Sequence, residues 1–150
     1  MKHTGHIKDT ENIGLLEDLR TEFKSDVKKL SEETIVEAVV ALANTEGGTL
    51  YIGVEDDGTI TGVHKTHQST AGLSAMIFNR TVPNVSVSTD IMYSFAKPII
   101  SITVPKSYEL IYTSSGRALQ RRLKGDGTPE NYPMFLRDIR RYMVNAYGLD

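Results

Sequence analysis

The sequence contains no cysteine, which excludes disulfide bonds, thiolate-bound metal ions and a cysteine nucleophile. Its apolar runs are far shorter than the ~20 residues that a membrane-spanning helix needs, so we expect no membrane contact. The first residues, MKHTGHIKDTENIG, hold no apolar segment of the kind found in secretory leaders, so we expect no signal peptide. These absences favour a cytoplasmic protein.

A phosphate-binding loop of the P-loop type is missing as well. Such a loop follows a strand, carries the spacing G-x4-G-K-[ST] and opens a helix, so that backbone N–H groups and a lysine meet the phosphates. Five of the twelve glycines lie between Ala41 and Val63, but Gly47 and Gly48 follow a helix pattern and no lysine stands at the required spacing. These glycines are better explained as a helix stop, a closely packed strand and a hairpin turn.

The amino-acid composition is typical of one ordinary globular domain. Of the 150 residues, 39% are apolar and 24% are charged, and a chain of this length can bury ~70% of its unfolded surface. We expect residues 1–14 to form a loose lead-in and residues 15–150 to form one domain. The chain stops just after a helix pattern, so further domains of a longer parent protein are one interpretation.

The first half contains the clearest local patterns. Residues 21–24 (TEFK) predict a short strand, and residues 31–48 predict a strong helix with Ser31 as its N-cap and acidic residues in its first turn. Two strands should form a hairpin around Asp57-Gly58, because this dipeptide suits the positive φ angles of a tight turn. A second helix is expected over residues 68–80.

The second half is richer in strands. Alternating patterns predict four strands, joined as neighbouring pairs near Ala96 and Gly116, over residues 85–95, 98–105, 109–114 and 116–123. Residues 124–133 predict a loop, and a closing helix should start near Pro133. The order of elements predicts an α+β fold: a single domain with a mixed β-sheet of about five to seven strands, two central helices and a C-terminal helix.

The closing helix should be amphipathic. One stripe should face the core, and it comprises Phe135, Leu136, Ile139, Tyr142 and Met143. The residues expected on the solvent side are Arg137, Arg140, Arg141 and Asn145.

Charge is unevenly spread along the chain, although the net charge is only −2. Residues 1–60 carry 13 acidic and 6 basic side chains, whereas residues 117–141 carry 3 acidic and 7 basic ones. A basic C-terminal part is typical of a protein with a polyanionic partner, and a solvated charged face is the alternative. The cations that we expect to contact phosphates are Arg121, Arg122, Lys124, Arg137 and Arg141.

Two details qualify this interpretation. Alternation in GRALQRRL places Arg121 on the apolar side of its strand, from which it could reach a carboxylate such as Glu22 instead of a ligand. Tyr112 and Tyr132 could stack on bases, or they could belong to the core or its rim. No group is suited to reading base edges, so weak sequence specificity is expected.

Four segments in a fixed order carry a resemblance to a known family. They are E-x4-EFK (Glu17 to Lys24), ALANTEGG, TLYIGVEDDGTITGV and GRALQRRLKGDGTPEN. Together they resemble the Schlafen/AlbA-type DNA-binding domain, also labelled a divergent AAA domain, over about Leu15 to Tyr142. Arg121 or Arg122 fits the family's arginine before a glycine, at a longer spacing. The resemblance implies a DNA-binding domain like those of bacterial transcriptional regulators and RecG-like proteins.

Three acidic residues form the catalytic hypothesis. Schlafen ribonucleases place three carboxylates in closely similar positions, so the resemblance implies a site made by Glu17, Glu22 and Asp56. Clustered carboxylates suit Mg²⁺ or Mn²⁺, which can activate water and neutralise a phosphodiester. The alternative is a turn with surface charge, in which Glu22 pairs with Lys24.

The histidines suggest no further site. His64 and His67 have no third ligand at useful spacing, and His3 and His6 fall in the lead-in. Three functions therefore stay open. The first is a DNA- or RNA-binding domain that needs no cofactor, the second is a metal-dependent nuclease, and the third is an interaction or homo-oligomerisation module with an apolar surface patch.

Overall fold

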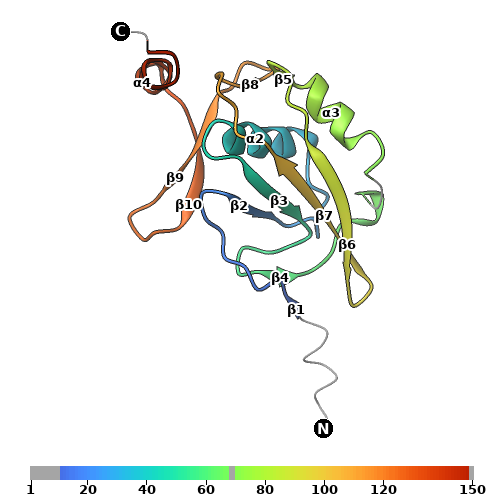
Figure 1. The fold of residues 1–150 in the computed structure, drawn as a ribbon. Helices are drawn as coiled ribbons and strands as arrows, with labels where there is room; N and C mark the ends of the chain where they lie inside the picture. Colours follow the sequence, from blue (N-terminus) through green and yellow to red (C-terminus); the bar gives the residue numbers. More distant parts are fainter. Residues whose placement is uncertain (1–10, 68–69, 149–150) are drawn as a thin grey trace.

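A computed structural model describes residues 11–67 and 70–148. Its centre is a four-stranded mixed sheet with the helix α2 (Glu32–Ala43) packed on one face (Figure 1). The strands lie in the order β2 (Thr21–Lys24), β3 (Gly48–Ile52), β7 (Lys97–Val104) and β6 (Ser88–Ser94). The pair β2 and β3 is parallel and is connected through α2, whereas the other two pairs are antiparallel.

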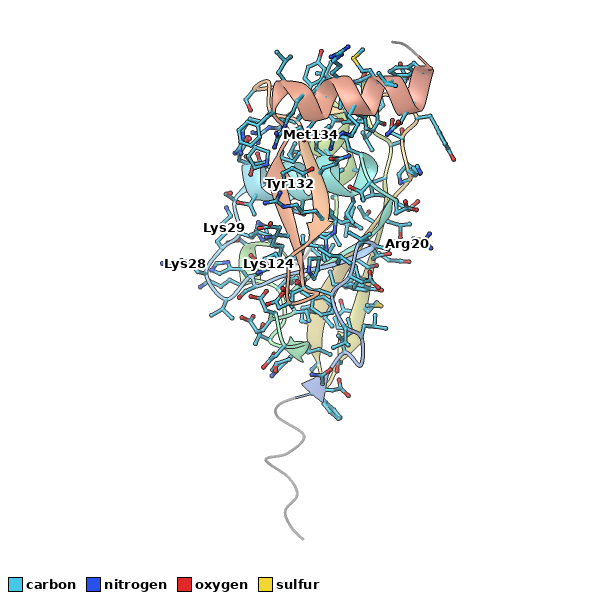
Figure 2. All side chains as sticks on the ribbon, turned by 90° about the vertical axis from the view of Figure 1, so that its left-hand side faces the viewer. Arg20, Lys28, Lys29, Lys124, Tyr132 and Met134 are labelled. Atoms are coloured by element: carbon cyan, nitrogen blue, oxygen red, sulfur yellow. The ribbon has the colours of Figure 1, made fainter. Side chains whose placement is uncertain are left out.

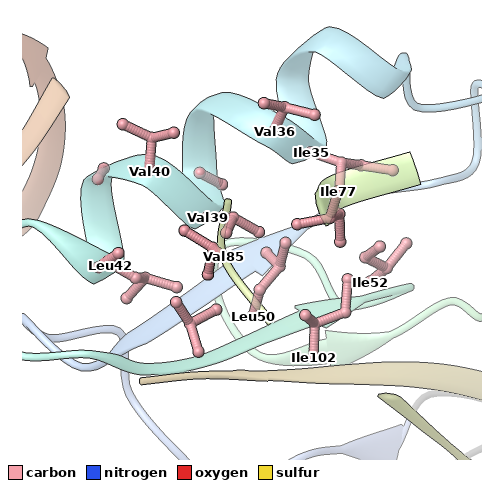
Figure 3. Close-up of a cluster of buried hydrophobic side chains, with 14 of the residues drawn as sticks. Ile35, Val36, Val39, Val40, Leu42, Leu50, Ile52, Ile77, Val85 and Ile102 are labelled. Carbon is pink, nitrogen blue, oxygen red and sulfur yellow. The ribbon is translucent and has the colours of Figure 1, made fainter. Parts of the chain in front are cut away.

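The helix α2 is buried on both sides. The hydroxyl of Ser31 accepts a hydrogen bond from the Thr34 N–H at 3.1 Å, so the predicted N-cap is confirmed. Figure 3 shows Val39 and Leu42 on the side of α2 that faces the sheet, where Leu50 and Ile102 lie. The opposite side of α2 is also buried, because the helix contacts β8 (Tyr112–Thr113) and β9 (Leu119–Leu123).

Three small sheets and two further helices complete the described chain. The strand pairs are β1 (Glu11–Asn12) with β4 (Thr59–Ile60), β5 (Thr81–Val82) with β8, and β9 with β10 (Pro129–Pro133). The helices that follow the 3-10 turn η1 (Lys65–His67) are α3 (Leu73–Asn79) and α4 (Leu136–Tyr147). Figure 2 shows α4 lying across one end of the β9–β10 hairpin, above Met134.

The predicted α+β class is confirmed, with ten strands in the described residues in place of the expected five to seven. The expected pairing of residues 109–114 with 116–123 was wrong, because β8 pairs with β5 and β9 pairs with β10. The segment 124–133 was expected to be a loop, yet its second half is a strand. Pro129 and Pro133 stand at the two ends of β10, where strands tolerate proline.

The helix boundaries and the lead-in also differ from expectation. The helix expected over residues 68–80 begins at Leu73, and residues 68–69 lie outside the described part. Within the lead-in expected over residues 1–14, Glu11–Asn12 form β1, and residues 1–10 lie outside the described part. The closing helix begins at Leu136 rather than near Pro133, and the Asp138 carboxylate accepts the Phe135 N–H at 2.9 Å.

The apolar stripe of α4 is less buried than expected, because Ile139 and Tyr142 are half-buried and the other three residues are exposed. Phe135 is 65% exposed, Leu136 is 82% exposed, and no residue of α4 is buried. Two tyrosine hydroxyls join the helix to the loop after β7: Tyr142 lies within 3.2 Å of the carbonyl oxygens of Ser107 and Glu109, and Tyr147 accepts the Leu110 N–H at 3.0 Å. Hydrogen bonds thus orient α4 where apolar burial was expected to.

Candidate functional site

The ANTEGG segment joins the end of α2 to the basic C-terminal part. Asn44 is 3% exposed, and its side-chain amide bonds both the N–H and the carbonyl of Ile111, at 2.8 and 2.7 Å, and the carbonyl of Leu119 at 3.0 Å. The Thr45 hydroxyl accepts the Arg121 N–H at 2.9 Å. This part of the family resemblance therefore has a structural role, which is to fix the start of the β9–β10 hairpin against α2.

Two glycines permit close backbone contacts that any side chain would prevent. Gly48 has φ +138°, and a Cβ at this position would overlap the carbonyl of Arg20. Gly53 has φ +101°, and its Cβ would lie 2.8 Å from the carbonyl carbon of Gly62. The interpretation of Gly53 as a closely packed strand residue is confirmed, whereas Gly48 was expected only to end the helix.

Arg121 is the most connected side chain of the region. It is 4% exposed, and an arginine offers five N–H donors. All five donate within the protein, to the carbonyls of Asp18, Leu19 and Thr21 and to the side chains of Glu22 and Asn131. Of these three carbonyls only that of Thr21 belongs to the edge strand β2, so the Arg121 guanidinium binds one carbonyl of this edge and two of the turn that precedes it.

The expectation that Arg121 contacts nucleic acid is therefore corrected. Its side chain is buried and its donors are occupied, so none is left for a phosphate. The other interpretation, that Arg121 reaches Glu22, is confirmed by a distance of 3.0 Å between Nη1 and Oε2.

The predicted carboxylates Glu17 and Glu22 lie close together. Glu22 is 6% exposed, and the same Oε2 atom also accepts from the Asn131 amide at 3.0 Å. The pKa of Glu17 is raised to about 7, first by burial and then by a hydrogen bond to Glu22 and the negative charge of Glu22. A hydrogen bond from the Phe23 N–H lowers this pKa, and the charge of Asp56 raises it slightly. At neutral pH a large part of Glu17 is therefore protonated.

This arrangement is a poor fit to a divalent cation. Within residues 11–67 and 70–148, no three histidine or carboxylate side chains are arranged to hold a metal ion. Glu22 already faces the guanidinium of Arg121, so a cation would have to compete with a buried ion pair. A metal would also have to displace the proton that the raised pKa keeps on Glu17.

The hairpin and α4 present the exposed cations. Arg122 is partly engaged, with Nε 2.7 Å from Glu130 and its guanidinium 4.2 Å from the ring centre of Tyr132. In the described part of the chain, the remaining cations of this region form no ion pair, and these are Lys124, Arg137, Arg140 and Arg141. Figure 2 shows Lys124 on the part of the hairpin farther from α4.

The sequence interpretation missed a buried contact to the histidine pair. Asp26 is completely buried, and its carboxylate accepts the N–H groups of Leu30 and His64, each at 2.7 Å. The same carboxylate lies 2.7 Å from Nδ1 of His67. The two histidines therefore hold the loop after β4 against the segment that joins β2 to α2, and the position of Asp26 just after β2 was the only local signal of this contact.

Solved structures share this fold. The DIP2311 protein from Corynebacterium diphtheriae is similar with a TM-score of 0.65 and 23% identity, over 88% of this chain and 28% of that protein. The N-terminal domain of a RecG-related protein from Nitrosomonas europaea is similar with a TM-score of 0.51 and 21% identity, over 66% of this chain and 72% of that one. The chain thus spans just over a quarter of the first of these proteins.

The family of this chain is assigned from its sequence. The model of the Schlafen, AlbA_2 family matches residues 17–128, from Glu17 to the end of the hairpin turn. The chain belongs to the Schlafen/AlbA family of nucleic-acid-associated domains, and the predicted resemblance is confirmed. None of the curated proteins is similar enough to count as a match. Every helix in the described ranges is too short or too polar to cross a bilayer.

Proposed function

We propose that this domain binds nucleic acid, and DNA in particular, through the exposed cations of α4 and the β9–β10 hairpin. The observation that carries the proposal is a contrast between two sets of cations. Arg20, Arg80 and Arg117 each lie within 3.4 Å of a glutamate. Lys124, Arg137, Arg140 and Arg141 have no such partner among the described residues, so their charge is available to phosphates.

The expected mode of binding is contact with the backbone of the nucleic acid. The four cations sit on long, exposed side chains, which suit phosphates and carry no sequence information directly. We therefore propose weak sequence specificity, as in an accessory domain of a transcriptional regulator. Membership of the Schlafen/AlbA family supports this proposal, and so does the RecG-related name of one structural neighbour.

Binding can be measured by fluorescence anisotropy of a labelled 20-base-pair duplex. The variant Lys124→Glu/Arg137→Glu should lose most of the affinity, because two attractive charges become repulsive. The matched control is Arg117→Glu, since Arg117 already pairs with Glu37 at 2.7 Å. Equal affinities of the wild type and the double variant would contradict the proposal.

A metal-dependent nuclease is the second candidate, and the proximity of Glu17 to Glu22 and Asp56 is the observation in its favour. The occupied state of Glu22 argues against it, so we expect no Mn²⁺-dependent cleavage of structured RNA by the wild-type domain. The control is Glu17→Gln, which keeps the shape of the side chain and removes its charge. Cleavage by the wild type that disappears in this variant would establish the nuclease and refute our expectation.

A further inference from the structure

A groove separates α4 from the body of the domain. Its volume of about 450 Å³ lies within the range of ~300–1,000 Å³ typical of small-ligand sites. The end of α2 contributes Asn44 and Thr45. Aromatic, amide and cationic side chains from the loop after β7, the hairpin and α4 also line the groove. They are Lys106, Tyr108, Gln120, Tyr132, Arg141 and Asn145.

Aromatic surface is available in this groove. Tyr108 is 76% exposed, which leaves most of its ring in water, and Nζ of Lys106 lies 5.8 Å from the ring centre. Tyr132 is held in place, because its hydroxyl donates to Oε1 of Gln120 at 3.0 Å. Both tyrosines line the groove, and exposed aromatic rings are the kind of surface on which nucleobases stack.

Unused hydrogen-bond donors line the same groove. The Gln120 amide nitrogen and the side chain of Asn145 make no hydrogen bond among the described residues, and Arg141 forms no ion pair there. Side-chain amides offer a donor and an acceptor side by side, which matches the edge of a base, and arginine matches a phosphate.

The acidic groups of the groove are already engaged. Glu46 lies 3.3 Å from Arg20 and 4.0 Å from Lys106. The Asp138 carboxylate accepts the Phe135 N–H at the start of α4. Glu46 is therefore paired with cations, whereas the Asp138 carboxylate keeps its charge and is bonded, among the described residues, only to the N–H at the start of α4.

We propose that this groove receives an unpaired nucleotide of a single-stranded nucleic acid. Tyr108 stacks on the base, Gln120 and Asn145 meet the base edge, and Arg141 contacts the phosphate. A base must leave its duplex to present both a face and an edge. This inference rests on the proposed nucleic-acid binding and narrows it to single-stranded segments.

The test compares a labelled 12-nucleotide single strand with a 12-base-pair duplex in anisotropy titrations. Tyr108→Ala should weaken single-strand binding about tenfold, because a stacked base contributes ~1–3 kcal/mol, and should leave duplex binding within about twofold. The matched control is Tyr93→Ala, since Tyr93 is 72% exposed on β6 and is not part of the groove lining. This control should change neither affinity.

The outcomes separate the groove from the general proposal. If Tyr108→Ala and Arg141→Gln both leave single-strand affinity unchanged while Lys124→Glu/Arg137→Glu abolishes binding, the proposed nucleotide site in the groove is refuted. Nucleic-acid binding by the exposed cations of α4 and the β9–β10 hairpin, the basic surface, is then still supported. If the wild type binds neither probe, both proposals fail. A loss of single-strand binding in Tyr108→Ala that spares duplex binding supports the inference, whereas Arg141→Gln should weaken binding of both probes because Arg141 also belongs to the cations proposed to contact duplex phosphates.

Discussion

The dependence of DNA binding on salt tests the basic surface most directly. Each phosphate neutralised on duplex DNA contributes about −0.9 to the slope of log K against log salt concentration. If Lys124, Arg137, Arg140 and Arg141 all contact phosphates, the expected slope is about −3.6. Between 50 and 200 mM salt the affinity should then fall about 150-fold.

Removing two of these charges makes the expectation quantitative. In the variant Lys124→Gln/Arg137→Gln the slope should become about −1.8, and the same change of salt should lower the affinity only about 12-fold. Glutamine is suitable because these exposed side chains form no ion pair in the described residues, so the fold should not respond. The control Arg117→Gln removes a cation already paired with Glu37 and should keep the steeper slope.

The assay is an anisotropy titration of a labelled 20-base-pair duplex at four salt concentrations between 50 and 200 mM. Circular dichroism of each variant shows whether the fold is retained. A wild-type slope flatter than about −1, or the same slope in the wild type and the double variant, would refute the assignment of these cations to phosphates.

Two further predictions concern the buried contacts beneath this surface. Arg121→Leu should destabilise the fold by about 3–5 kcal/mol in urea unfolding, because it removes the buried cation of Glu22 and leaves only Lys24, whose Nζ lies 3.8 Å away. Arg121→Lys should restore little, since lysine has three donors in place of five. A loss below about 1 kcal/mol in Arg121→Leu would contradict this. Because the folded pKa of Glu17 is raised from 4.5 to about 7, its contribution to stability is fully present below pH 4.5 and is lost as the pH rises through 7. Glu17→Gln, which stays neutral, should therefore gain stability relative to the wild type between pH 5 and pH 8, and a constant difference across that range would show that Glu17 does not titrate there.

The local parts of the fold could be predicted from the sequence. The α2 helix and its Ser31 cap depend on neighbouring residues, as does the turn between β6 and β7, and both were predicted correctly. The same holds for Gly53, whose position in a strand pattern suggested close packing. Family membership could also be predicted from the sequence, because it depends on four short segments that stand in a fixed order along the chain.

The tertiary structure alone decided which strands pair and which groups each charged side chain contacts. Alternation shows that residues 119–123 form a strand, but not that its partner is β10, because turn residues on both sides, Gly116 and Asp126-Gly127, are compatible with a hairpin. Alternation likewise placed Arg121 on the inner face, and contacts with residues 18–22 and Asn131 decided that all its donors would be used there. The groove beside α4 exists because tyrosine hydroxyls hold that helix, and no local pattern specifies contacts between residues so far apart in the chain.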